Sequence, residues 1–189
     1  MSSHLDALLD EHRSIAAVLH AMRYLVRAKR DSGAKIDPQV FGAMLYYLDV
    51  FPERLHHPKE EAVFFGVLRQ RTHEADSVLE ELGREHKYGE DSIRSMEQAL
   101  LRFVQGGEAE FAAFAAKTEA YVEGYLQHMR KEEDIVIPCA RKVLTAEDWR
   151  QVEAAFAGNS DPLKGADSTD YRKLFSRIVN LAPPPVGLG

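Results

Sequence analysis

Two short stretches of the chain pair a histidine with a glutamate at the same spacing. His56 is followed four residues later by Glu60, and His128 is followed four residues later by Glu132. On an α-helix, residues four apart lie on one face with their Cβ atoms about 5–6 Å apart, so each pair presents an imidazole and a carboxylate to one point. Two such pairs that face each other would form a metal cage.

The first stretch allows two assignments, because it contains adjacent histidines and adjacent glutamates. His57 and Glu61 have the same four-residue spacing as His56 and Glu60. Alignment of the glutamate pair with that of the second stretch makes His56 the equivalent of His128. We therefore favour His56 and Glu60 as ligands, and we place His57 and Glu61 beside them as neighbours that support the ligands.

Two further histidines occupy positions where a buried residue is expected. His12 and His86 each lie in a series of apolar residues spaced by three and four, which is the pattern of the buried side of a bundle helix. Any one of these histidines alone could be a hydrogen-bonded core residue. Together they form a symmetric set of six candidate metal ligands, namely His12, His56, Glu60, His86, His128 and Glu132.

The types of these side chains indicate the kind of metal. The single cysteine, Cys139, excludes a site with several thiolates, so any metal is held by nitrogen and oxygen. Two carboxylates buried among apolar residues need a cation or specific hydrogen bonds. A pair of divalent ions bridged by both glutamates would meet that need, and iron suits such ligands best, with manganese and zinc as alternatives. Six side chains do not saturate two octahedral ions, so open positions remain for a small ligand.

Four long helices are predicted to position the six residues. Ser3 is the expected cap of the first helix, which should end near Gly33, and Asp37-Pro38 opens the second, which should run to about Arg71. Thr72 is the expected start of the third, and Gly106-Gly107 separates it from the fourth. The short connections indicate an all-α, antiparallel, up-down-up-down four-helix bundle, and the repeated pattern indicates pseudo-two-fold symmetry.

Two details of these helices carry further expectations. Pro52 and Pro58 lie inside the second helix and should bend it, because proline lacks a backbone N–H. The buried side of the fourth helix is expected to run from His128 through Glu132 to Ile135 and Cys139.

The chain is expected to divide at residue 144. Residues 1–144 would form the bundle, and residues 145–189 would form a helical extension that packs on the bundle or on a partner subunit. Thr145 and Asp148 have the spacing of a capping box and should open a short helix to about Ala157. A last helix is expected over residues 169–180, and we expect a homodimer through that helix or through an exposed face of the bundle.

Composition excludes several classes of protein. Hydrophobic residues make up 45% and charged residues 29% of the 189 residues, which is typical of a globular domain. The formal charge of -6, with acids and bases interleaved, argues against a nucleic-acid or anionic-lipid partner. The longest apolar runs are far shorter than the roughly 18 residues of a membrane span, and the first residues lack the pattern of a secretory signal. We expect a cytoplasmic protein.

The order His, His-x-x-x-Glu, His, His-x-x-x-Glu at these intervals resembles the hemerythrin-like family, also called the HHE cation-binding domain, over about residues 4–142. The resemblance implies a non-haem di-iron centre inside the bundle, held by the same six residues. The chain departs from the oxygen-carrying hemerythrins at Glu90, where those proteins have a second histidine one turn after the histidine of the third helix. A site richer in oxygen ligands favours oxidised metal, which argues against reversible oxygen carriage. Glu90 is either an additional ligand or a solvated residue.

Three functions fit this pattern. The first is a di-iron protein that binds or senses a small ligand such as oxygen, nitric oxide or peroxide. The second is an oxidoreductase that decomposes peroxide or oxidises ferrous iron, with Glu90, Tyr121 or Tyr125 as a donor of protons or electrons. In the third the metal only ties the helices together. The sequence does not choose among the small ligands, because each needs only an open metal position.

Overall fold

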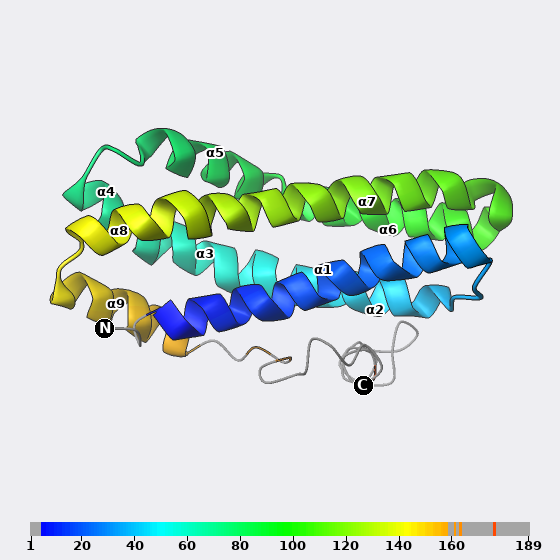
Figure 1. Cartoon of the computed structure of the whole chain (residues 1–189), viewed down its shortest axis with the longest axis horizontal. Coiled ribbons are helices and arrows are strands. Elements are labelled where there is room, and N and C mark those ends of the chain that lie inside the picture. Colours follow the sequence, from blue (N-terminus) through cyan, green and yellow to red (C-terminus); the bar gives the residue numbers. More distant parts are fainter. Residues whose placement is uncertain (1–4, 159–160, 162, 164–175, 177–189) are drawn as a thin grey trace.

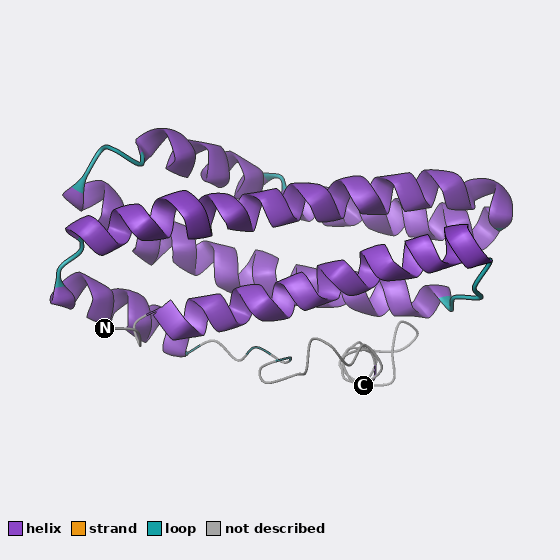
Figure 2. Cartoon of the chain, viewed as in Figure 1, coloured by secondary structure: helices purple, strands orange, loops and turns teal. Residues whose placement is uncertain are grey.

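The computed structural model describes residues 5–158, 161, 163 and 176, and this part of the chain contains helices and no strands (Figures 1 and 2). Long helices lie side by side in an antiparallel bundle, as predicted. The first of them, α1 (Asp6–Ser32), ends at Gly33, whose φ of 68° lies in the left-handed region that favours glycine. Ser3, the expected cap of this helix, lies outside the described residues.

The second bundle helix is one continuous coil in which α-helical and π-helical turns alternate. Asp37 caps its start as predicted, because its side chain accepts a hydrogen bond from the backbone N–H of Gln39 at 3.0 Å. The two prolines lie in or beside the wider π turns, so the backbone expands locally instead of breaking. The segments are α2 (Pro38–Leu48), η2 (Asp49–His56), α3 (His57–Lys59), η3 (Glu60–Phe65) and α4 (Gly66–Arg71), where η denotes a π-helical segment.

The third bundle helix starts later than expected and is interrupted. Thr72 ends α4 instead of opening a helix, since its hydroxyl accepts the backbone N–H of Glu74 at 3.1 Å and forms a local turn. The chain becomes helical again in α5 (Asp76–Lys87), breaks at Tyr88, and continues as α6 (Gly89–Gly106). Figure 1 shows that α5 is tilted away from the line of α6.

The fourth bundle helix consists of α7 (Glu108–Lys131), η4 (Glu132–Val136) and α8 (Ile137–Val143). The expectation that Ile135 faces the core is wrong, because its side chain is 50% exposed while Val136 and Ala140 are buried. A π turn holds more residues than an α turn, and so it moves the buried side of the helix by one residue along the sequence.

A short helix, α9 (Ala146–Ala157), follows the bundle and packs against α1 and η3. The predicted capping box of Thr145 and Asp148 is confirmed, and Asp148 also receives two hydrogen bonds from Arg71, at 2.8 and 2.9 Å. The last predicted helix, over residues 169–180, falls almost entirely outside the described residues. Within the described part of the chain, no helix is both long enough and apolar enough to cross a membrane.

The apolar core is divided into two clusters with a polar layer between them. On α1, Leu8 belongs to one cluster and Ile15 to the other, and His12 lies between them. The same holds for the other three candidate histidines. Along each of their bundle helices, the histidine lies between residues of one cluster and residues of the other. The polar layer is therefore held in place by packed side chains above and below it, which limits the movement of its own side chains.

Candidate metal centre

Glu60 lies at the centre of the buried polar layer. Its Oε1 is 3.2 Å from Nε2 of His56 and 3.7 Å from Nε2 of His12, and its Oε2 is 3.5 Å from Nε2 of His86. The residue is fully buried. One carboxylate therefore faces histidines from three bundle helices, and its two oxygens point to different sides of the layer.

Glu132 occupies the equivalent position on the opposite helix. Its Oε2 is 3.4 Å from Nε2 of His12, and its Oε1 is 3.3 Å from Nε2 of His128 and 3.9 Å from Nε2 of His86. All six candidates from the sequence thus lie in one cluster. They form a first half-site of His12, His56 and Glu60 and a second half-site of His86, His128 and Glu132, and each glutamate directs one oxygen toward each half-site.

The hydrogen bonding of this cluster tests whether its residues fit a metal. Five buried atoms have no hydrogen-bond partner, namely Nε2 of His12 and all four carboxylate oxygens of Glu60 and Glu132. Buried carboxylates are costly unless a cation or hydrogen-bond donors compensate them. Divalent cations placed between the two glutamates would satisfy all five atoms at once. The donor set of imidazole nitrogens and carboxylate oxygens therefore fits the metal that the sequence predicted.

The glutamates directly before His12 and His86 orient His56 and His128, the other two histidines of the cage. The Nδ1–H of His56 donates to Oε2 of Glu11 at 2.7 Å, and the Nδ1–H of His128 donates to Oε2 of Glu85 at 2.8 Å. Such a bond fixes the tautomer and turns Nε2 toward the cage. The roles of Glu11 and Glu85 were not predicted from the sequence, although the Glu-His pair is repeated in the two halves of the chain.

Two more carboxylates cross from one half of the chain to the other. The Nδ1–H of His12 donates to Oε1 of Glu133 at 2.8 Å, and the Nδ1–H of His86 donates to Oε1 of Glu61 at 3.1 Å. Each of these glutamates directly follows a candidate metal ligand. Glu61 therefore supports a histidine, in agreement with its expected place beside the ligands.

The charges inside the cage shift the pKa values of its histidines. Burial lowers the pKa of His56, but the carboxylates of Glu60 and Glu11 outweigh burial and raise it to about 10. His128 behaves in the same way, since Glu132 and Glu85 overcome burial and raise its pKa to about 10. When no cation is bound, protons on these two rings would balance the buried carboxylates, and a bound cation would displace those protons.

His57 breaks the symmetry of the cage. It is 6% exposed, its Nδ1–H donates to Glu53 at 3.1 Å, and its Nε2 accepts the hydroxyl of Tyr125 at 3.0 Å. Its ring stacks on that of His86 with 4.1 Å between the centroids. The equivalent position after His128 is Met129, so the second helix alone supplies this additional imidazole.

Donor atoms of His57 and the cage lie close enough to share a cation. His57, Glu60, His86 and His128 each offer an atom within 4.8 Å of the others, and the same holds for His12, His56 and Glu60. Glu60 is common to both groups. His57 therefore lies beside the second half-site, and its Nε2 would have to exchange the hydroxyl of Tyr125 for a cation in order to become a ligand.

Glu90 lies away from the cage. Its side chain is 62% exposed and forms an ion pair with Arg94 at 3.1 Å. Of the two interpretations of Glu90, the geometry favours the solvated residue. Tyr125, by contrast, lies at the cage through its hydrogen bond to His57.

Comparison with known proteins gives one match. The model of the family described as Hemerythrin HHE cation binding domain matches residues 3–140, a range that includes all six candidate ligands. No curated protein and no solved structure matches the chain.

Proposed function

The chain belongs to the hemerythrin HHE cation-binding domain family, and on that premise we propose that the cage holds two iron ions as a non-haem di-iron centre. His12 and His56 would serve one ion, His86 and His128 the other, and Glu60 and Glu132 would bridge them. The observation that carries this proposal is the set of five buried, unsatisfied atoms between the two half-sites. Manganese and zinc are the alternative metals, because both accept the same ligands.

The proposed role of the centre is to bind or sense a small ligand such as oxygen, nitric oxide or peroxide. When bound, the metal would supply an open position with Lewis acidity and redox chemistry. The chain contributes rigid placement, since Glu11, Glu85, Glu61 and Glu133 each hold one imidazole with its Nε2 toward the cage. The apolar clusters above and below the cage limit the access of water.

A second candidate function is an oxidoreductase that decomposes peroxide or oxidises ferrous iron. It is supported by the hydrogen-bonded series from Tyr125 through His57 to Glu53 beside the second half-site. Burial raises the pKa of Glu53 to about 7, so that this carboxyl group can hold or release a proton near neutral pH. Tyr125→Phe should then slow peroxide turnover while leaving the metal content unchanged.

The first test of the proposed function is metal analysis of protein purified without added metal. We expect about two irons per chain in the wild type and almost none in the variant His56→Ala/Glu60→Ala, because each ligand lost weakens both binding and folding of the site. The matched control is His73→Ala/Asp76→Ala, which removes an exposed histidine–carboxylate pair that is not part of the cage. A wild type without metal, or with one zinc that the cage variant retains, would contradict the proposal.

The second step separates ligand binding from a purely structural metal. The iron-loaded protein is exposed without air to oxygen, nitric oxide and peroxide in turn, and its visible spectrum is recorded. A change with any of these ligands supports an open metal position. No change with all three would leave the metal with a structural role only.

The cytoplasmic location and the homodimer stay predictions of the sequence.

A further inference from the structure

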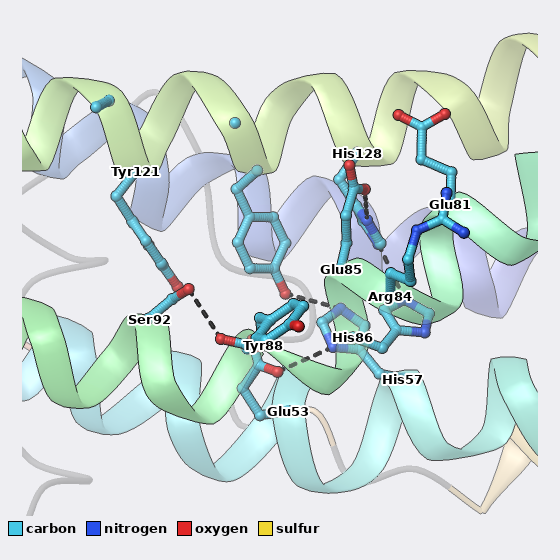
Figure 3. A pocket seen from close by; sticks show the side chains of 14 residues that line it. Glu53, His57, Glu81, Arg84, Glu85, His86, Tyr88, Ser92, Tyr121 and His128 are labelled. Atoms are coloured by element: carbon cyan, nitrogen blue, oxygen red, sulfur yellow. Dashed lines mark hydrogen bonds and ion pairs between the residues drawn. The ribbon is translucent and has the colours of Figure 1, made fainter.

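A cavity of ≈ 520 Å³ adjoins the cage on the side of the second half-site (Figure 3). It lies among α5, α6, α7 and the part of the second bundle helix that holds Glu53 and His57, and its lining also includes His86 and His128. Neither His12 nor His56 belongs to the lining. Its exposed residues, among them Glu81, Arg84 and Tyr88, mark where the cavity opens to solvent.

The first half-site has no comparable opening among the described residues. His12 is 2% exposed and His56 is 1% exposed. The ring of Phe156 on α9 packs edge-on against the ring of His56, with 5.7 Å between their centroids. A molecule from solvent therefore reaches the cage at His86 and His128, because α9 covers the other side.

The cavity exists because the third bundle helix is broken and small residues line its wall. A side chain at Gly89 would overlap the carboxylate of Glu53, so any other residue at the start of α6 would require that carboxylate to move. On the opposite wall, a Cβ atom at Gly124 would meet no atom within 4 Å. Ala120 on the same helix also faces the cavity.

The size and chemistry of the cavity exceed the needs of a diatomic ligand. Its volume falls in the range of about 300–1,000 Å³ that is usual for sites of small organic molecules. The rings of Tyr88, Tyr121 and Tyr125 line part of its wall, and such rings favour an aromatic guest through stacked or edge-to-face contacts. A hollow of ≈ 390 Å³ shares Tyr88, Ser92, Ala120 and Tyr121 with it and extends it along α6 and α7.

We propose that this cavity binds a small aromatic molecule with a hydroxyl head group and presents that head group to His86 and His128. The ring of the molecule would lie among the three tyrosines, and its hydroxyl would point to the second half-site. This inference deepens the proposed function by naming the class of substrate and the half-site it meets. Binding in the cavity is nevertheless measurable apart from any reaction at the metal.

The test is calorimetric titration of the full chain, as purified, with phenol. We expect saturable binding of one phenol per chain that is several-fold tighter than the binding of cyclohexanol, because the latter lacks the aromatic contacts. Gly124→Phe should weaken phenol binding at least about tenfold by placing a ring in the cavity. Ala116→Phe is the matched control, since it puts the same ring on an exposed position of the same helix outside the cavity.

Two readouts keep the outcomes distinct. Metal analysis of Gly124→Phe should match the wild type, which shows that the cage is intact and that only the cavity has been filled. Nuclear magnetic resonance of zinc-loaded protein should show phenol-dependent shifts for the rings of His86 and His128 and none for His12 and His56. Equal phenol binding by Gly124→Phe and the wild type, or equal binding of phenol and cyclohexanol, would overturn the inference. A metal-free protein that still binds phenol would contradict the proposed function alone.

Discussion

The two half-sites are built from the same types of residue, two histidines and a glutamate, but their surroundings differ. In each half-site, the glutamate that directly precedes one histidine accepts a hydrogen bond from the other histidine. Glu11 does so for His56, and Glu85 does so for His128. The first half-site is covered by α9, whereas the second meets a cavity at the break between α5 and α6. The repeat therefore accounts for the cage, and departures from the repeat account for access to it.

The departures are concentrated at three positions. His57 has Met129 as its equivalent, and its partner Glu53 has Tyr125 as its equivalent. The helix that carries His12 is continuous, but the helix that carries His86 breaks two residues later at Tyr88. A symmetric cage with one modified side would hold the two proposed metal ions and expose only one of them to an external molecule.

The largest expected effect comes from the residue that belongs to both half-sites. Glu60→Ala should reduce the metal content from about two ions per chain to near zero, because the two oxygens of Glu60 face different half-sites. His12→Ala removes a ligand of the first half-site only and should spare more metal. Metal analysis of both variants checks this, and one full equivalent retained by Glu60→Ala would show that the half-sites are independent.

The cover of the first half-site should matter to stability. Phe156→Ala should lower the free energy of unfolding by about 3–5 kcal/mol, because it leaves a cavity where a buried ring now packs on His56. Urea unfolding followed by circular dichroism measures the change. A loss below about 1 kcal/mol would mean that neighbouring side chains close the gap and that α9 is a weak cover.

Removal of the carboxylates that orient His56 and His128 should affect metal binding differently in the two half-sites. Glu11→Ala and Glu85→Ala should each weaken metal binding by about 10–100-fold, since both free an imidazole to rotate. We expect the larger loss for Glu11, whose side chain is 6% exposed, because water can replace the carboxylate of Glu85, which is 39% exposed. Competition with a metal chelator provides the affinities, and a larger loss for Glu85→Ala would reverse the comparison.

A smaller effect is expected on the pH dependence of the melting temperature of protein treated with a chelator. The pKa values of His56 and His128, one from each half-site, are raised from 6.5 to about 10 in the folded protein. Groups with a raised pKa stabilise the fold below pH 6.5, and this stabilisation is lost as the pH rises toward 10. The melting temperature of the chelator-treated protein should therefore fall by a few degrees over that interval.

The metal-loaded protein is the control for this pH dependence. There a cation would take the place of the protons on both histidines, so its melting temperature should stay nearly constant over the same interval. Thermal melts of the two forms in matched buffers provide the comparison. A chelator-treated protein whose melting temperature rises with pH would contradict the charge balance described for the cage.

The spacing of residues along the helices was sufficient to predict the bundle and to bring six candidate ligands together. His56 and Glu60 were separated from His57 and Glu61 only by aligning the repeat, and the structure places Glu60 in the middle of the cage. Glu11 could have been found in the same way, because the Glu-His pair recurs in the other half of the chain.

Other features had no signal in a single sequence. The expected position of Ile135 assumed regular α-helical spacing, and the π turn from Glu132 to Val136 shifted it to the surface. The break at Tyr88 has neither proline nor a side-chain cap to announce it, and the side chain that lies against Gly89 after the break, that of Glu53, comes from another helix of the bundle. The spacing of residues along one helix does not predict contacts with side chains of other helices.

The crossed hydrogen bonds also constrain when the cage can form during synthesis. Glu133, which orients His12, lies 121 residues after it in the chain. Phe156, which covers His56, is made later still. An emerging chain can coil its first two bundle helices early, yet His12 stays without its partner until the fourth helix has left the ribosome. Productive loading of metal therefore belongs to the end of translation or to the time after it.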